Sequence, residues 1–395
     1  MTRVRSVDAL RGGVVALMIF VNAIGGMPGV PAWTQHLPSE TDGYSLTDLV
    51  FPWFLFLVGV SLPLSLGRFT RAAGFAWGAL GRIIPRALGL IVLGLVYINE
   101  GRLDAAGTGM TGDHWKLEAL VAALVLWGRA PGDRGPWRRR IETSLRLAAA
   151  AALAWLLVIF RGKLEDGSTG LVASWWGILG MIGWAYLVGS VAFLIVRGDR
   201  AALVGLTAIS MLVYIASRHD RLGVLTGLDR IWSVGGFLGS TTGLVLAGAA
   251  AGTWLTDPPR GGTGAARPLL WWGLGLWAAG WLLRPLHGYH KNAGTESWAL
   301  VAAGQASLLL AALHLRLDRN GKTLAPGLLE WCGRNALLAY VLPELMGALA
   351  GFVGLNLFPF WGRGGIAGIA NDVLLTWLMV GLAALAARRG VLLRL

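Results

Sequence analysis

Three polar side chains at the borders of the first two apolar segments have the types needed for acid–base chemistry. Asn22 closes the first apolar segment, Asp48 opens the second, and His36 lies in the polar loop between them. An imidazole, with an ordinary pKa of about 6.5, can take up a proton near neutral pH, and a carboxylate partner fixes its tautomer. An asparagine amide can donate a hydrogen bond to a developing oxyanion. We therefore expect these three residues to form a reaction centre.

Asp48 and Glu344 each allow a second interpretation. Asp48 can equally cap the helix that it opens, by accepting hydrogen bonds from free backbone N–H groups. Glu344 follows Pro343 inside an apolar segment, and a proline there frees carbonyl groups, which is tolerated best beside a cavity. Nine positions separate Glu344 from Asn335, so the two residues should lie on opposite sides of one helix. We expect one to line a tunnel and the other to contact a neighbouring helix.

The loop around HGYHKN carries a second group of polar residues. His287 and His290 could suggest a metal site, but neither an acidic residue nor a cysteine follows at ligand spacing, so we expect no metal. A polar rim that contacts substrate is the favoured interpretation. The candidate substrate-binding residues are Glu40, Asp42, His290, Lys291, Asn292 and Glu344.

The composition predicts an all-α bundle of membrane-spanning helices. The 395 residues are 55% hydrophobic and 14% charged, with a mean hydropathy of +0.61, whereas soluble domains carry roughly 25% charged residues. Apolar runs long enough to cross a bilayer recur along the chain and predict about ten to twelve crossings. The expected spans are 9–27, 48–67, 82–99, 115–129, 143–161, 173–196, 200–217, 231–255, 268–286, 296–316, 332–353 and 366–387.

The distribution of charge predicts the orientation of the bundle. The net charge of +13 comes from Lys and Arg in short loops, which is typical of membrane topology and argues against nucleic acid as a partner. Because most of the Lys and Arg residues fall on one side of the predicted topology, both termini are expected in the cytoplasm and the His36 loop outside. The lone Cys332 excludes an intramolecular disulfide. We expect one integral-membrane domain over residues 1–395, without a cleavable signal peptide.

Several blocks of sequence resemble a known family. RSVDALRG (5–12), FVN (20–22), His36 and LTDLVFPWFLFLVG (46–59) occur in order, and HKNAGTESW (290–298) and GRNALLAYV (333–341) follow. These blocks resemble the transmembrane acyltransferases typified by heparan-α-glucosaminide N-acetyltransferase and its bacterial relatives. The first group is the specific one, whereas residues 100–285 are similar only in hydropathy.

The resemblance implies an activity and a set of roles. Acetyl-CoA would bind from the cytoplasm, and its acyl group would pass through the bundle to the amine of an amino sugar or glycan on the far side. His36 would act as base or acyl carrier, with Asn22 beside it. The resemblance also implies a bacterial inner membrane, and Gly-rich segments such as 235–252 are compatible with a homodimer. The candidate residues for binding CoA are Arg5, Arg11, Arg82, Arg86 and Asn335, although the arginines equally suit plain topology.

Two other functions stay open from the sequence. RSVDALRG also resembles the opening of the acyltransferase-3 family, whose members O-acylate polysaccharide outside the cytoplasm. That family generally has a histidine within the first span, where this chain has Asn22, so we favour N-acylation. The third possibility is a sugar transporter without enzymatic activity. The lack of a visible internal repeat counts against transport.

Overall fold

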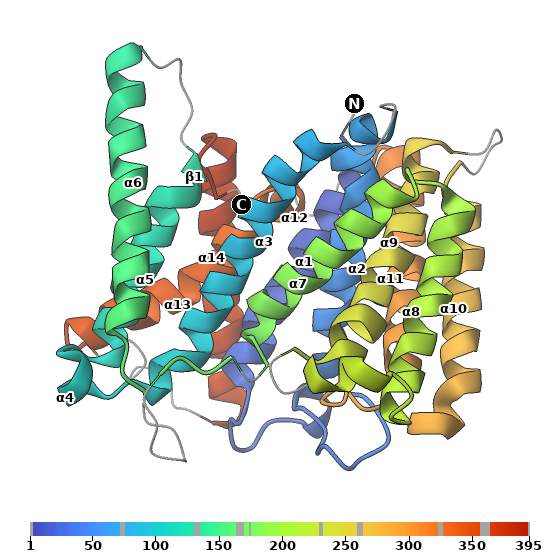
Figure 1. The fold of residues 1–395 in the computed structure, drawn as a ribbon, viewed down its shortest axis with the longest axis horizontal. Helices are drawn as coiled ribbons and strands as arrows, with labels where there is room; N and C mark the ends of the chain where they lie inside the picture. Colours follow the sequence, from blue (N-terminus) through green and yellow to red (C-terminus); the bar gives the residue numbers. More distant parts are fainter. Residues whose placement is uncertain are drawn as a thin grey trace.

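A computed structural model describes residues 3–71, 76–129, 135–162, 170–173, 175–228, 232–258, 264–322, 327–355 and 364–393. The described chain is a bundle of α-helices with one two-residue strand pair, in which β1 (Gly128–Arg129) is antiparallel to β2 (Leu392–Leu393). Figure 1 shows the start of α1 at the top of the bundle and the loop between α1 and α2 at the bottom. The all-helical class predicted from the sequence is confirmed.

Each of the expected spans overlaps a helix. The helices are α1 (Arg5–Ile24), α2 (Leu46–Leu66), α3 (Trp77–Asn99), α4 (Ala105–Thr108), α5 (Gly112–Trp127), α6 (Pro136–Ile159), α7 (Gly177–Ile195), α8 (Arg200–Arg218), α9 (Thr241–Thr256), α10 (Ala266–His287), α11 (Glu296–Leu313), α12 (Leu328–Gly333), α13 (Ala336–Phe352) and α14 (Gly365–Arg388). Within the described ranges, 8 helices are long and apolar enough to cross a membrane, and Ala336–Phe352 is a shorter apolar helix. The chain is therefore a multi-pass membrane protein.

Two of the expected spans are interrupted. The expected span 332–353 is divided at Asn335, whose backbone leaves the helical conformation between α12 and α13. The expected span 231–255 begins with a π-helical segment, Gly235–Ser240, before α9 continues it. Gly239 has non-helical backbone angles at this junction. Apolar length alone does not reveal such breaks, because a long apolar run can include a residue whose backbone leaves the helical conformation.

The core forms where α2 and α9 cross. Almost every residue of α9 from Thr241 to Thr253 is buried, and α9 also packs against α7 and α8. A Cβ atom at Gly248 would overlap the carbonyl oxygen of Phe56, and one at Gly59 would overlap that of Val245. Small residues let two backbones approach this closely, which is how helices associate where lipid removes the hydrophobic driving force.

The loop from Gly25 to Ser45 is fastened at both ends. The side chain of Gln35 accepts from the Gly26 amide at 2.8 Å and donates to the Ile24 carbonyl at 2.9 Å, so it satisfies the end of α1. Thr47 Oγ1 donates to the Thr34 carbonyl at 2.6 Å. Ser45 and Asp48 form a capping box that begins α2. These contacts hold the intervening histidine in a defined place.

Candidate active site

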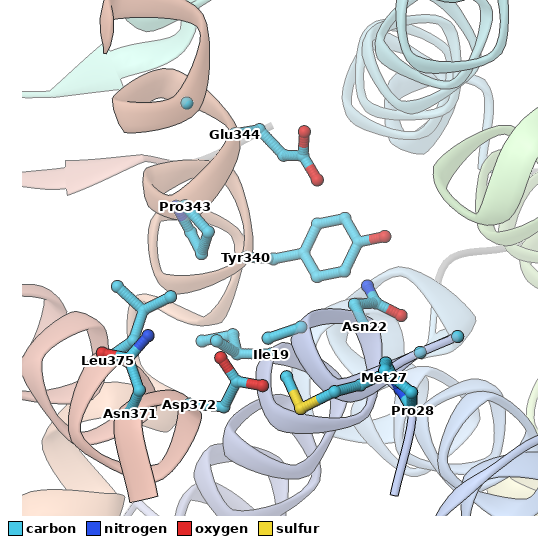
Figure 2. A pocket seen from close by; sticks show the side chains of 14 residues that line it. Ile19, Asn22, Met27, Pro28, Tyr340, Pro343, Glu344, Asn371, Asp372 and Leu375 are labelled. Atoms are coloured by element: carbon cyan, nitrogen blue, oxygen red, sulfur yellow. The ribbon is translucent and has the colours of Figure 1, made fainter. Parts of the chain in front are cut away.

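Asn22 lies near the end of α1 between two cavities. It lines a cavity of about 530 Å³ that His36 also lines, and a second of about 470 Å³ on the side of α13 and α14. Figure 2 shows its amide beside the Tyr340 hydroxyl. The structure thus brings two of the predicted catalytic residues to one cavity from separate elements.

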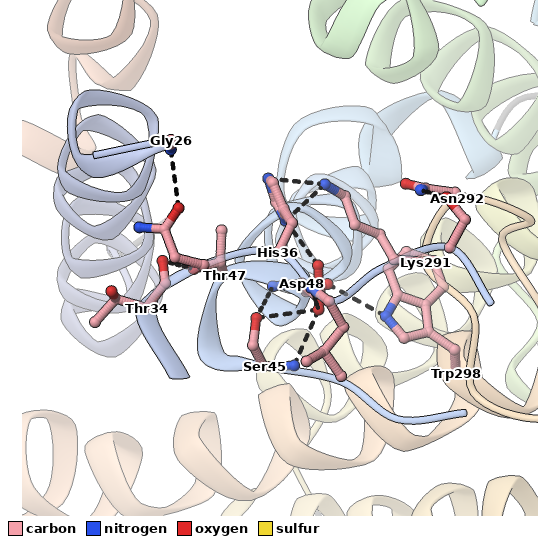
Figure 3. A network of polar contacts seen from close by, with 12 residues as sticks. Gly26, Thr34, His36, Ser45, Thr47, Asp48, Lys291, Asn292 and Trp298 are labelled. Carbon is pink, nitrogen blue, oxygen red and sulfur yellow. Dashed lines mark hydrogen bonds and ion pairs between the residues drawn. The ribbon is translucent and has the colours of Figure 1, made fainter. Parts of the chain in front are cut away.

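His36 and Asp48 form a direct pair. His36 Nδ1 lies 2.7 Å from Asp48 Oδ1, and the Asp48 side chain is 3% exposed whereas that of His36 is 49% exposed. The other carboxylate oxygen of Asp48 accepts from the Ser45 amide and hydroxyl, each at 3.0 Å (Figure 3). Asp48 therefore performs both of the roles that the sequence left open, because one oxygen caps the helix and the other faces the imidazole.

This arrangement determines which ring nitrogen is available. If Nδ1 donates its proton to the carboxylate, Nε2 keeps the lone pair and faces away from Asp48. The Trp298 indole nitrogen donates to the Asp48 carbonyl at 3.2 Å, which ties the start of α2 to α11. The imidazole is consequently oriented for accepting a proton on its exposed side.

Lys291 completes the polar group around His36. Its Nζ lies 3.0 Å from both ring nitrogens, and it comes from the loop between α10 and α11 (Figure 3). Burial lowers the pKa of Lys291, and the nearby Asp48 carboxylate only partly opposes this shift. Asn292 lines the same cavity and donates to Ser39 Oγ at 2.6 Å. Two candidate substrate-binding residues thus line the His36 cavity, and one of them, Lys291, contacts the imidazole.

The other substrate-binding candidates near the His36 loop are Asp42, His290 and Glu40, and two of them make contacts that hold loops together. Asp42 accepts from the Tyr289 amide at 2.7 Å and from Arg284 at 3.0 Å, and the Tyr289 hydrogen bond is the main reason that the pKa of Asp42 is lowered. His290 contacts the Ser39 carbonyl at 3.1 Å. Glu40 is exposed. These side chains connect the two loops around the cavity or lie at its outer edge.

A third cavity, of about 310 Å³, opens toward the other end of α1. Four arginines line it, and so does Met18, which also lines the His36 cavity. Ser61 accepts from Arg11 at 2.6 Å, and the Arg86 guanidinium lies over the Tyr186 ring at 4.8 Å. The four arginines are Arg3, Arg11, Arg86 and Arg334.

The structure separates the predicted CoA-binding residues into two groups. Arg11 and Arg86 lie in this arginine-lined cavity, whereas Arg5 pairs with Glu330 through two hydrogen bonds of 3.0 and 2.9 Å. Arg82 lies over the Phe69 ring at 5.5 Å, and Asn335 bonds to the backbone of Val391 and Leu393. Sequence reasoning missed Arg3 and Arg334. Arg334 carried a signal, since it is a charged residue within an expected span.

Glu344 lies apart from Asn335 and lines the cavity of about 470 Å³. Lys116 Nζ lies 2.5 Å from its carboxylate and 2.6 Å from that of Glu100. Asp372, from α14, lines the same cavity (Figure 2). Among the other charged residues within spans, Arg284 pairs with Asp42 and His314 with Asp318. Some polar residues of the expected spans therefore line a cavity, whereas others form ion pairs that connect parts of the fold.

The fold defines a polytopic membrane protein with a paired carboxylate and imidazole at one end of the bundle. The model of a family described as a domain of unknown function, DUF5009, matches residues 3–234, more than half of the chain. The chain therefore belongs to that family. The match includes Asn22, His36 and Asp48 but ends before Lys291.

Two characterised relatives are similar over part of the chain. Heparan-alpha-glucosaminide N-acetyltransferase of Homo sapiens is 36% identical over 177 residues, which cover 43% of this chain and 26% of the human protein. The protein of the same name from Mus musculus is 36% identical over 97 residues, covering 25% of this chain and 14% of the mouse protein. The matched stretch thus spans about a quarter or less of either relative. This likeness supports the resemblance drawn from the sequence blocks.

Proposed function

We propose that this protein is a transmembrane acetyltransferase that transfers an acetyl group from acetyl-CoA to the amine of an amino sugar on the other side of the membrane. The single observation that carries the proposal is the Asp48–His36 pair at a cavity lined also by Asn22. The names of the similar proteins support N-acetylation as the chemistry. The His36 loop is the extracytoplasmic end, and the membrane is the inner membrane of a bacterium.

The arginine-lined cavity is the place for the phosphates of CoA. Arginine binds phosphate through two parallel hydrogen bonds, and four guanidinium groups converge on this cavity. Arg11 in this cavity and Asn22 in the other are eleven positions apart on α1, or about 16 Å along the helix axis. Met18 lies between the two cavities and lines both. The acyl-bearing arm of the donor passes this side chain to reach His36.

His36 acts as the base in the transfer. Nε2 takes a proton from the acceptor nitrogen as that nitrogen forms a bond with the thioester carbonyl carbon. The bond from this carbon to sulfur then breaks, and the proton passes from His36 to the departing thiolate, giving an amide and free CoA thiol. Asp48 holds the ring in the required tautomer and stabilises its protonated form. Acyl transfer through the imidazole itself is the second route compatible with this geometry.

Asn22 and Lys291 supply the hydrogen-bond donors that stabilise the developing oxyanion. The carbonyl oxygen gains negative charge as the acceptor attacks, and an amide N–H or an ammonium N–H can stabilise it. Both side chains line the His36 cavity, and Lys291 already contacts the imidazole. Lys291 must leave Nε2 when the acceptor arrives, so the acceptor replaces it as the hydrogen-bond partner of His36.

The test is a transfer assay with purified protein, acetyl-CoA and glucosamine. We expect acetylated glucosamine and an equal amount of free CoA thiol. His36→Ala should abolish turnover in a protein that still folds by circular dichroism, with a lowered melting temperature because the buried Asp48 carboxylate loses its partner. The matched control is His219→Ala, an exposed histidine outside the cavity, which should keep full activity. Turnover by His36→Ala would refute the assignment, and transfer to hydroxyl sugars alone would replace N-acetylation by O-acetylation.

A further inference from the structure

The cavity of about 470 Å³ on the other side of Asn22 is a second polar site. It lies between the end of α1, the middle of α13 and the first turns of α14 (Figure 2). Its volume is within the range of small-molecule sites, which is roughly 300–1,000 Å³. The transfer chemistry around His36 uses only Asn22 from its lining. The polar residues that line it are Asn22, Tyr340, Glu344, Asn371 and Asp372.

Asp372 is the residue that points to a ligand. It is 5% exposed, yet its Oδ2 has no hydrogen-bond partner in the described part of the chain. Its carboxylate faces the cavity in Figure 2, across from Asn22. A buried carboxylate without a partner is costly within a membrane, and such residues typically serve a substrate or ion path. A hydrogen-bond donor with positive charge would satisfy it.

The charges around the cavity are predominantly negative. Glu344 faces the cavity and shares Lys116 with Glu100, so one ammonium serves two carboxylates. Asp372 is the second carboxylate of the lining, on the opposite wall, whereas Glu100 and Lys116 are not lining residues. Two carboxylates line the cavity, and of these only Glu344 has an ammonium partner in the described part of the chain, which favours a cationic ligand over an anionic or neutral one. The amides of Asn22 and Asn371 provide donors and acceptors suited to hydroxyl groups.

We propose that this acidic cavity binds the protonated amino sugar before transfer, with Asp372 pairing with its ammonium group and the amides holding its hydroxyls. The proposal rests on the proposed function in that the bound sugar is the acceptor for the His36 site. Asn22 lines both cavities, so the acceptor moves past this one side chain to reach the imidazole. On leaving Asp372 the ammonium group gives its extra proton to water, so that a neutral amine arrives at His36 for the attack. The acidic cavity thereby selects amino sugars over neutral sugars.

The experiment measures binding of radiolabelled glucosamine to the detergent-purified full chain without any donor. Wild-type protein should bind glucosamine more tightly than glucose or N-acetylglucosamine, neither of which carries an ammonium group. Asp372→Asn should weaken glucosamine binding about tenfold or more, the typical cost of a lost charge-assisted hydrogen bond, and should leave glucose binding unchanged. Asp220→Asn is the matched control, because Asp220 is exposed outside the cavity, and it should bind glucosamine like wild type.

A second variant covers the case in which Asp372→Asn does not fold. Gly347 lines the cavity and has open space where a Cβ would lie, so Gly347→Leu fills the cavity without removing a polar group and should also lose glucosamine binding. Wild-type affinity in either folded variant would overturn the proposal, as would equal losses for glucosamine and glucose. If the protein transfers acetyl groups but glucosamine binding does not depend on Asp372, only the role of the acidic cavity in binding the acceptor is refuted. Binding that depends on Asp372 without any transfer refutes only the proposed function.

Discussion

At the scale of single residues, one carboxylate connects the fold to the chemistry. Asp48 begins α2 through its capping box with Ser45 and orients His36 through its second oxygen. A capping carboxylate is already fixed by the helix, so the imidazole gains a rigid partner without further ordering of side chains. The Thr47 and Trp298 hydrogen bonds hold the same turn from both sides.

We expect Lys291 to increase the rate of transfer and to lower the stability of the fold. Burial lowers its pKa more than Asp48 raises it, so the charged lysine costs the folded state free energy relative to the unfolded chain. This cost is complete below the lowered pKa and disappears as pH rises through the ordinary value of 10.5. Lys291→Met should therefore raise the melting temperature at pH 7, with the gain lost toward pH 10.5, while transfer falls about tenfold or more.

The measurement pairs thermal unfolding with the transfer assay across this pH range. Lys322→Met is the matched control, since Lys322 is exposed at the other end of the bundle, and it should change neither quantity. A melting temperature of Lys291→Met that falls at pH 7 would show that the contact with His36 is stabilising instead.

At the scale of elements, the crossing of α2 and α9 should be the most sensitive packing in the bundle. Gly248→Ala would place a Cβ against the carbonyl of Phe56, so one helix must move. Overpacking of this kind costs about 1–3 kcal/mol. We expect a clear drop in the melting temperature of Gly248→Ala in detergent, together with reduced transfer, because α2 carries Asp48.

Gly275 in α10 is the control for this substitution. A Cβ there meets open space, and alanine is the better helix former, so Gly275→Ala should be neutral or slightly stabilising. Equal melting temperatures for the Gly248 and Gly275 variants would mean that α2 and α9 separate easily and do not form the rigid centre.

At the scale of the whole molecule, the orientation in the membrane can be tested with cysteines. Cys332 is the single cysteine of the sequence, so a Cys332→Ala background has no thiol and should be silent toward maleimides. With the His36 loop outside, Thr41→Cys should react with a membrane-impermeant maleimide in intact cells. Lys322→Cys, in the loop after α11, should react only after permeabilisation. The reverse pattern would invert the orientation and place acetyl transfer in the cytoplasm.

The break between α12 and α13 shows why sequence reasoning did not complete the donor site. Asn335 stood out as a polar residue in an expected span, but its side chain holds Val391 and Leu393. Arg334 beside it lines the cavity that Arg3, Arg11 and Arg86 also line. Spacing along one segment cannot tell these neighbours apart, because their roles depend on helices that are distant in the sequence.

The sequence by itself determined the membrane class and the helical content, and it selected Asn22, His36 and Asp48 as candidates for one site. Hydropathy and polar residues at segment ends are local properties, so they can be found without knowing which helices touch. Only the tertiary structure decided that Lys291 meets an imidazole 255 positions away, and that Asp372 faces Asn22 across a cavity. Such contacts arise from helix packing, in which side-chain volume and close glycine crossings select the neighbours.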